Sequence, residues 1–328
     1  MKLDSEFYRM PLWFDVARMI EEVAAFKEHE WRNHPSDYTG NTALILISRN
    51  GEQNDDFVGP MKPVPAIELC PYIKQVLASL KTVFGRSRLM RLAPHSEVPR
   101  HADINYHWKN RVRIHVPIIT HPDIQFVCGE KSVHMAAGEA WIFDAWKQHT
   151  VINPTDVLRV HLVADTSGTP EFWRMVENSE KPFDSGQQNI SESKFIPFEP
   201  EKQVSLVCEQ FTHPAIMSPG EVDALIMDLI SESVGGQQRE VDAFIQLLHR
   251  FRQYWRCAWQ TYGPTEQGVR HFQTIIEGAR AQLVNFPSVI LRSNGSDAAN
   301  VFTSWVLNWA LTVDRYPDSR TTVRSASS

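Results

Sequence analysis

The stretch that decides the fold is RVRIHVPIIT, residues 111–120, the third of five short runs rich in branched and aromatic residues. Segments that carry Gly, Pro, Asn and Asp separate these runs, as they commonly separate strands. The series therefore predicts an antiparallel sandwich or barrel. The other four runs are TALILIS (42–48), SRLMRLA (87–93), AWIFDA (140–145) and VLRVHLVAD (157–165).

Apolar residues at helical spacing flank this series and interrupt it once. Residues 15–27 and 67–83 carry apolar side chains three and four apart, which predicts two amphipathic helices, the second ending at Gly85. The helical period returns near Ser218, which with Glu221 has the spacing of a capping box. Three further helical patterns follow at 239–260, 266–284 and 298–313. Residues 319–328 are expected to form a frayed tail.

These patterns predict a mainly β protein with helices (α+β). Its core is expected to be an antiparallel sandwich or barrel, followed by an all-helical C-terminal region. The expected domains are a catalytic domain at 1–170 with N-terminal helices, a polar linker at 171–204 and a helical domain at 205–328. We expect the C-terminal helices to cover one side of the barrel or to make a homodimer contact.

Composition argues against several classes of protein. The four cysteines are far apart and include no CxxC pair, so neither a disulfide framework nor a zinc knuckle is expected. Charges interrupt the apolar residues of the N-terminus, so neither a signal peptide nor a membrane span is predicted and a cytoplasmic location is expected. Acidic and basic residues are interspersed at a net charge of -6, which gives no footprint for nucleic acid. The expected partner is a small molecule or a peptide.

Histidines bunch inside the strand-rich segment, where eight of the 13 fall between His95 and His161. In the sequence HAD, alternation along an extended segment places His101 and Asp103 on one side, so both can reach one metal ion. A second histidine from a distant strand would complete a face of three ligands. Two histidines and a carboxylate with open positions suit iron(II) that binds a cosubstrate and O2. Because an HxD also arises by accident in surface turns, its neighbours decide between these interpretations.

The neighbours of the HxD include a distal histidine and an arginine. The run GEAWIFDAWKQH ends at His149, and Arg159 follows ten residues later. Alternation in LRVHLVAD places Arg159 and His161 on one face, and a buried arginine there needs an anionic partner such as a dicarboxylic cosubstrate. His115 and His161 are rivals to His149 as the second histidine ligand.

The run RVRIHVPI alternates in the same way. Arg111, Arg113 and His115 share one face, while the branched residues between them share the other. This face points either into the barrel or, if the strand lies at an edge, into water.

Taken together, residues from Leu89 to Asp165 resemble the aspartyl/asparaginyl beta-hydroxylase family of iron(II)- and 2-oxoglutarate-dependent dioxygenases, including its bacterial proline hydroxylase relatives. The motifs occur in the order and approximate spacing of that family. They are RLMRLAPHSEVPRHAD (88–103), RVRIHVPI (111–118), GEAWIFDAWKQHTVIN (138–153) and RVHLVAD (159–165).

The resemblance implies a double-stranded β-helix core, the jelly roll of cupin-like proteins, and it implies roles for particular residues. Iron would be bound by His101, Asp103 and His149, and the distal carboxylate of 2-oxoglutarate by Arg159. Arg113 and His115 would contact carboxylate oxygen at the other end of the cosubstrate, and Asp144 and Asn153 would support the site.

The chain also departs from the family pattern at two positions. His95 stands where the family often has glycine, and Met90 stands where some members use a serine hydroxyl for the cosubstrate. Asp103 groups the chain with members resembling bacterial proline hydroxylases, because some animal members lack this carboxylate.

The activity implied by the resemblance is hydroxylation of a C–H bond, coupled to decarboxylation of 2-oxoglutarate to succinate and CO2. The expected substrate is an amino acid, free as in proline or peptide-linked as in Asp and Asn. An inward-facing Arg111 would bind a substrate carboxylate and favour a free amino acid. The alternatives are a hydroxylase of a lipid or other small metabolite, and a cupin-like metal-binding sensor without turnover.

Several other side chains have both a functional and a structural interpretation. His134 either reaches the substrate or lies on the surface, and His107 and Trp108 either cover the site or belong to a solvated loop. The aromatic residues of QYWRCAWQTYG are expected in a helical core rather than on a ligand-stacking surface. A further hypothesis places four residues near the substrate, namely Asp37, Tyr38, Asn50 and Glu52.

Overall fold

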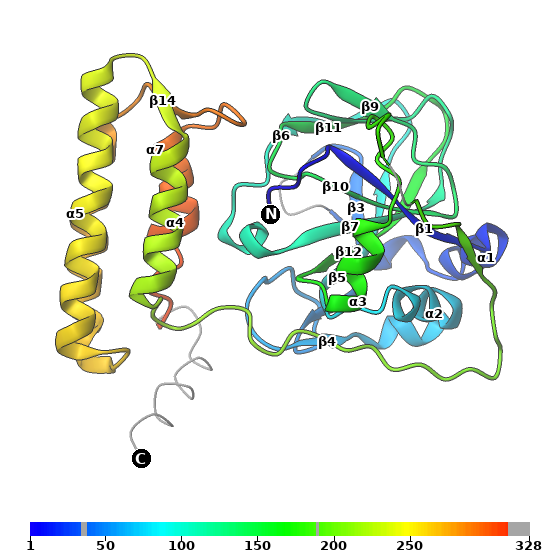
Figure 1. The fold of residues 1–328 in the computed structure, drawn as a ribbon. Helices are drawn as coiled ribbons and strands as arrows, with labels where there is room; N and C mark the ends of the chain where they lie inside the picture. The colour runs from blue at the N-terminus through cyan, green and yellow to red at the C-terminus, as the bar shows by residue number, and fades with distance from the viewer. Residues whose placement is uncertain (34–37, 188–189, 314–328) are drawn as a thin grey trace. The chain divides into compact units, whose positions relative to one another are not determined.

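The structure is a computed structural model that describes residues 1–33, 38–187 and 190–313 (Figure 1). It divides into two compact units. A β-rich unit comprises residues 1–103 and 110–210, and a helical unit comprises residues 104–109 and the chain from Phe211 onward.

A large sheet forms the framework of the β-rich unit. Its neighbouring strands pair antiparallel, except for the parallel pair of β1 and β13. In spatial order its strands are β13 (Lys194–Ile196), β1 (Phe7–Phe14), β10 (Glu139–Phe143), β7 (Val112–Ile119), β12 (Arg159–Thr166), β5 (Phe84–Leu92), β3 (Asn41–Arg49) and β2 (Arg32–Asn33), with β4 (Met61–Pro63) on β3.

A second, four-stranded antiparallel sheet packs against the inner face of the first. Its order is β6 (Ser96–His101), β11 (His149–Asn153), β8 (Gln125–Cys128) and β9 (Lys131–Val133). Aromatic side chains of both sheets, among them Phe126 and Phe143, form one buried apolar cluster between them. The predicted mixed fold with a jelly-roll core is therefore confirmed.

The outer face of the large sheet is covered by three helices, α1 (Val16–Ala24), α2 (Pro71–Ser79) and α3 (Pro170–Glu177), which share a second apolar cluster with it. The carboxylate of Glu22 accepts hydrogen bonds from the backbone N–H groups of Tyr72 and Ile73, at 2.7 and 2.9 Å. A buried carboxylate at the first turn of α2 satisfies donors that the helix leaves unpaired. This contact fixes α1 against α2.

Strand alternation separates the two faces of the large sheet. In β12, Leu162 and Ala164 belong to the outer cluster beneath the helices. Because successive side chains point to opposite faces, Arg159, His161 and Asp165 point inward. On β7, Pro117 lies opposite His161 and Arg113 lies opposite Asp165, so Pro117 and Arg113 share this inner face.

The helical unit has a core of aromatic side chains. Trp255 is fully buried and donates to the carbonyl of Met217 at 2.9 Å, so the core interpretation is confirmed for this residue, whereas the neighbouring Tyr254 is exposed. Ser218 accepts from the backbone N–H of Glu221, which confirms the N-cap of the predicted capping box, while the Glu221 carboxylate accepts from the Tyr106 hydroxyl. The elements are α4 (Pro219–Glu232), β14 (Ser233–Gly235), α5 (Gln238–Tyr262), α6 (Val269–Arg280), β15 (Val289–Leu291), α7 (Ala298–Phe302) and a π-helical turn (Thr303–Leu307).

A short segment that directly follows Asp103 in the chain, residues 104–109, belongs to the helical unit. The Tyr106 hydroxyl hydrogen-bonds to Glu221, and Lys109 forms an ion pair with Asp228. The Lys109 ammonium also lies 4.4 Å from the ring centroid of Trp305. Both ends of the segment are therefore tied to residues far along the chain.

Three features differ from the sequence-based expectations: strand β1, the end of helix α2 and the content of the predicted linker. The N-terminal strand β1 was not predicted, because Pro11 and Arg9 interrupt its apolar residues and a register shift lies between Met10 and Trp13. Helix α2 ends at Ser79 instead of reaching Gly85, since Lys81 takes the left-handed conformation (φ 51°) that commonly ends a helix.

The predicted polar linker contains α3 and β13, and the predicted domain boundaries stay predictions. The predicted C-terminal tail lies outside the described residues. No helix in the described ranges is both long and apolar enough to cross a membrane.

Candidate metal centre

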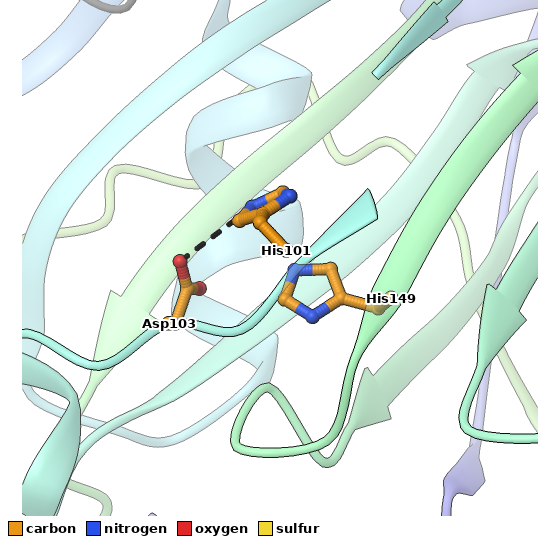
Figure 2. A group of neighbouring side chains, drawn as sticks. All are labelled: His101, Asp103 and His149. Atoms are coloured by element: carbon orange, nitrogen blue, oxygen red, sulfur yellow. Dashed lines mark ion pairs between the residues drawn. The ribbon is translucent and has the colours of Figure 1, made fainter. Parts of the chain in front are cut away.

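Three side chains converge at the end of the small sheet (Figure 2). The register of β6 and β11 places His101 opposite His149, with ring centroids 4.3 Å apart. Asp103 follows β6, and its Oδ1 lies 3.8 Å from His101 Nε2. One ligand atom from each residue lies within 4.8 Å of the other two. Ligands about 2 Å from one ion lie at most about 4 Å apart, so small rotations bring these atoms into coordination range.

Backbone carbonyls orient both imidazoles. His101 Nδ1 lies 2.7 Å from the carbonyl of Pro99, and His149 Nδ1 lies 2.9 Å from the carbonyl of Lys147. Each Nδ1–H can donate to its carbonyl, which leaves Nε2 with its lone pair directed away from the backbone. The same i to i-2 contact on two paired strands therefore presents two Nε2 atoms to one point.

The protonation states of this group also suit a metal. Burial lowers the pKa of His149 to about 4, so its imidazole is neutral at pH 7. Burial alone would raise the pKa of Asp103, but Arg113 and the two histidines hold it below the ordinary value. Asp103 Oδ2 is buried and makes no hydrogen bond within the described part of the chain. A neutral imidazole at His149 and an ionised carboxylate at Asp103 are donors of the kind that a divalent ion requires.

Arg159 is a buried cation without an acidic partner. Its side chain is buried, and it forms no ion pair with any residue in the ranges that the structure describes. Burial lowers the pKa of Arg159 to about 9. Its Nη2 lies 2.9 Å from Nδ1 of His161, so the predicted sharing of one face is confirmed. It lines a small cavity with Thr120, Ile124, Phe126, Met135, Val151 and His161.

Arg113 and His115 lie on the same inner face but in different surroundings. Arg113 lies between two carboxylates, with Nη1 3.5 Å from Asp103 and Nε 3.4 Å from Asp165. His115 is buried against Phe126, and its Nδ1 lies 3.4 Å from Nδ1 of His161. Burial and the nearby Arg159 hold the pKa of both histidines well below the ordinary value. Both imidazoles are therefore neutral.

Arg111 contacts a carboxylate of the protein itself. Its Nε lies 2.9 Å from Oε1 of Glu209 and its Nη2 lies 2.9 Å from Oε2, which is a bidentate pair. The hypothesis that Arg111 binds a substrate carboxylate would therefore require this pair to break.

Two residues implied as supports hold backbone segments in place. Asn153 donates to the carbonyls of Ala93 and Val157, at 2.9 and 2.8 Å, and so ties the end of β11 to two loops. Asp144 accepts from the backbone N–H of Trp146 at 3.1 Å, in the turn that leads to His149.

Asp144 predicts a pH dependence of stability. Burial raises its pKa from 3.8 to about 6, so the folded protein binds this proton more tightly than the unfolded chain. The stability contributed by the protonated form is therefore present below about pH 4 and lost as the pH rises to about 6. Asp144→Asn keeps an acceptor for Trp146 and should raise the melting temperature at pH 7.5 but not at pH 4. The gain corresponds to at most about 3 kcal/mol.

Thermal unfolding at both pH values checks this expectation. The matched control is Asp156→Asn, whose side chain is 98% exposed. An equal gain at both pH values would show that ionisation of Asp144 does not limit stability.

The other sequence-based candidates have mixed outcomes. The Tyr38 ring centroid lies 6.2 Å from that of His101, while Asp37 lies outside the described residues. His107 belongs to the segment within the helical unit. His134 Nδ1 lies 3.3 Å from the carbonyl of Ile124 on the partly exposed side of the small sheet. His95 has φ 50°, a left-handed conformation that glycine adopts more readily than other residues.

Sequence reasoning missed the charged residues farther along the inner face. Arg86 and Arg88 on β5 point inward with Asp165, and the aspartate lies between Arg86 and Arg113. The signal was present in FGRSRLMRL, where arginines alternate with small and apolar residues. Only the pairing of β5 with β12 shows which face these arginines occupy.

Comparison with known proteins gives one family match. Residues 19–168 match the sequence profile described as Aspartyl/Asparaginyl beta-hydroxylase. A search of curated protein sequences found no match.

Solved structures with similar folds include a 2OG-Fe(II) oxygenase family oxidoreductase from Burkholderia pseudomallei, at 14% identity and a TM-score of 0.36, over 46% of this chain and 77% of that one. A prolyl-4-hydroxylase from Pseudomonas putida matches at 10% identity and a TM-score of 0.35, over 50% and 92%. A prolyl hydroxylase from Trichoplax adhaerens matches at 9% identity and a TM-score of 0.37, over 50% and 84%.

The matched segment contains the histidine and aspartate side chains of Figure 2 as well as Arg159. Residues 19–168, a little under half of the chain, are similar to the aspartyl/asparaginyl beta-hydroxylase family.

Proposed function

We propose that the protein is a 2-oxoglutarate-dependent dioxygenase that hydroxylates a C–H bond of an amino acid, either free, as in proline, or peptide-linked, as in Asp and Asn. The observation that carries this proposal is the buried Arg159, which has no acidic partner among the residues that the structure describes. It lies on the inner face of β12, between the same two sheets that hold the group of His101, Asp103 and His149. A buried guanidinium without a carboxylate is costly unless an anionic ligand binds it.

His101, Asp103 and His149 would hold iron(II) as a face of two histidines and one carboxylate. Iron and 2-oxoglutarate, when bound, supply the activation of O2. The protein's own contribution begins with the carbonyls of Pro99 and Lys147, which fix the tautomers of the imidazoles. Arg113 keeps the carboxylate of Asp103 ionised and oriented.

Arg159 would bind the distal carboxylate of 2-oxoglutarate through its planar fork of N–H donors. His161 contacts Nη2 of this guanidinium and limits its rotation. Because His161 and His115 are neutral, neither competes with Arg159 for the anion. His115 and Arg113 would contact carboxylate oxygen at the opposite end of the cosubstrate. The apolar walls formed by Phe126, Met135 and Val151 would exclude water from its carbon chain.

A mass-spectrometric assay tests this proposal. The full chain is incubated with iron(II), ascorbate, 2-oxoglutarate and pools of free amino acids and short peptides. We expect one pool member to gain one oxygen atom, with succinate released in equal amount. Oxygen gain in a lipid or other metabolite instead would identify the alternative substrate class. Metal binding with neither succinate nor oxygen gain in any pool would favour a metal-binding sensor.

A further inference from the structure

Two buried arginines on the inner face of β5 share one acidic side chain. Arg88 Nη1 lies 2.9 Å from Oδ1 of Asp55, and Arg86 Nη1 lies 3.7 Å from the same oxygen and 3.1 Å from the Asp55 carbonyl. The arginine side chains are 4% and 6% exposed, whereas that of Asp55 is 28% exposed. Asp55 thus covers two guanidinium groups from the solvent side.

An ionic chain connects this pair with the metal ligands. Arg86 Nε lies 3.7 Å from Asp165, which contacts Arg113, which in turn contacts Asp103. The strand register also places Arg88 close to His115, because Val163 on β12 lies opposite His115 on β7 and opposite Arg88 on β5. Arg86 and Arg88 therefore lie beside the site, on the face that it uses.

The charges of this arginine pair are incompletely compensated. Arg86 Nε is buried and makes no hydrogen bond within the described ranges. For Arg88, Asp55 is the one acidic partner within ion-pair distance in the part of the chain described, and burial lowers the pKa of this guanidinium to about 9. Arginine pairs with room for more acceptors are typical of sites for carboxylate or phosphate.

Asp55 lies where another anion could displace it from Arg86 and Arg88. It lies between β3 and β4 in a stretch without helix or strand, and its carboxylate is partly solvated. Phe57 of the same stretch stacks on Arg86, with the guanidinium carbon 4.2 Å from the ring centroid. A displaced Asp55 would regain water, while the buried arginines would need another anion.

We propose that Arg86 and Arg88 form a subsite for a carboxylate group of the substrate, and that Asp55 occupies it until the substrate arrives. This inference rests on the proposed function and narrows it to substrates with a free carboxylate near the hydroxylated carbon. The carboxylate belongs either to a free amino acid or to the side chain of an acidic residue in a peptide. Arg86 and Arg88 are then specificity residues, and Asp55 competes with the substrate.

The first test needs neither substrate nor turnover. In the full-length Asp55→Ala variant, sodium acetate serves as a probe for the vacated position and is compared with sodium chloride at equal ionic strength. We expect acetate to raise the melting temperature of this variant by about 2 °C or more and to leave the wild type unchanged. The control is Asp56→Ala, since Asp56 lies in the same stretch but pairs with Arg49.

Two further variants keep the stability test decisive. Adding Arg88→Met to Asp55→Ala should remove the acetate response, because it removes the guanidinium that the probe contacts. If Asp55→Ala does not fold, Asp55→Asn keeps the shape and removes the charge. A response equal to that of Asp56→Ala, or no response in either Asp55 variant, overturns the proposal whether or not the protein is an oxygenase.

The second test uses turnover and separates the two sources of the carboxylate. Free amino acids, their carboxamides, and an acidic residue blocked at both backbone ends are compared for oxygen gain. We expect gain only in compounds with a free carboxylate, and a roughly tenfold or larger rise in KM in Arg88→Met. Equal gain in the carboxamides overturns the subsite while leaving the hydroxylase function intact.

Discussion

His101→Ala is expected to abolish succinate release and oxygen gain, with a loss of more than about 100-fold in turnover. The substitution removes one of two Nε2 atoms that the β6–β11 register brings to a single point. The remaining His149 and Asp103 would offer two ligands, which hold a divalent ion weakly. We therefore also expect the purified variant to retain far less iron(II) after desalting, as measured by elemental analysis.

A second histidine of the β-rich unit provides the control for this experiment. His29 is exposed and far along the chain from the metal ligands, so His29→Ala should retain both iron and turnover. Normal turnover in His101→Ala would exclude this residue as a ligand. Lost turnover with full iron retention would point instead to a role in binding the cosubstrate.

Arg159→Met should change stability and cosubstrate binding in opposite directions. The buried guanidinium has no acidic partner in the described ranges, so an apolar chain of similar length should raise the melting temperature without ligand. The same change removes the bidentate contact with 2-oxoglutarate. Loss of a charge-assisted pair corresponds to a roughly 10- to 100-fold rise in KM for 2-oxoglutarate. Iron retention should be unchanged.

Thermal unfolding with and without 2-oxoglutarate separates these effects. Wild-type protein should be stabilised by 2-oxoglutarate, and the variant should not. Arg159→Lys should lie between them, because it keeps the charge without the planar fork. Arg91→Met is the matched control, since Arg91 lies on the neighbouring strand β5 but pairs with Glu28 and stacks on Trp31. A destabilised Arg159→Met with normal KM would show that the side chain is structural.

Local periodicity was sufficient to predict five strands of the large sheet, β3, β5, β7, β10 and β12, but none of the five runs covers a strand of the small sheet. Strands such as β7 and β12 alternate so regularly that the inward face of Arg159 and His161 followed from the sequence. The pairing of His101 with His149 could be proposed because motifs fix the spacing of both residues. Where alternation is interrupted, as at Pro11 in β1, prediction failed because pairing with β10 outweighs local preference.

Contacts between distant residues could not be predicted in the same way. That Asp55 meets Arg88 depends on the path of the chain between β3 and β4, which has no periodicity. The bidentate pair of Arg111 and Glu209 joins residues 98 positions apart. An inward arginine on an isolated strand therefore does not reveal whether its partner is a ligand or another part of the chain.

The segment after Asp103 has a consequence for the order of events during synthesis. Tyr106 and Lys109 precede their partners Glu221 and Asp228 by 115 and 119 residues. At about 5–20 residues per second, the ribosome needs roughly 6–24 s to add those partners. His101, Asp103 and His149 have by then been synthesised, while the segment that follows Asp103 still lacks these contacts. Residues 104–109 therefore reach their final conformation only after the helices of their own unit have been made.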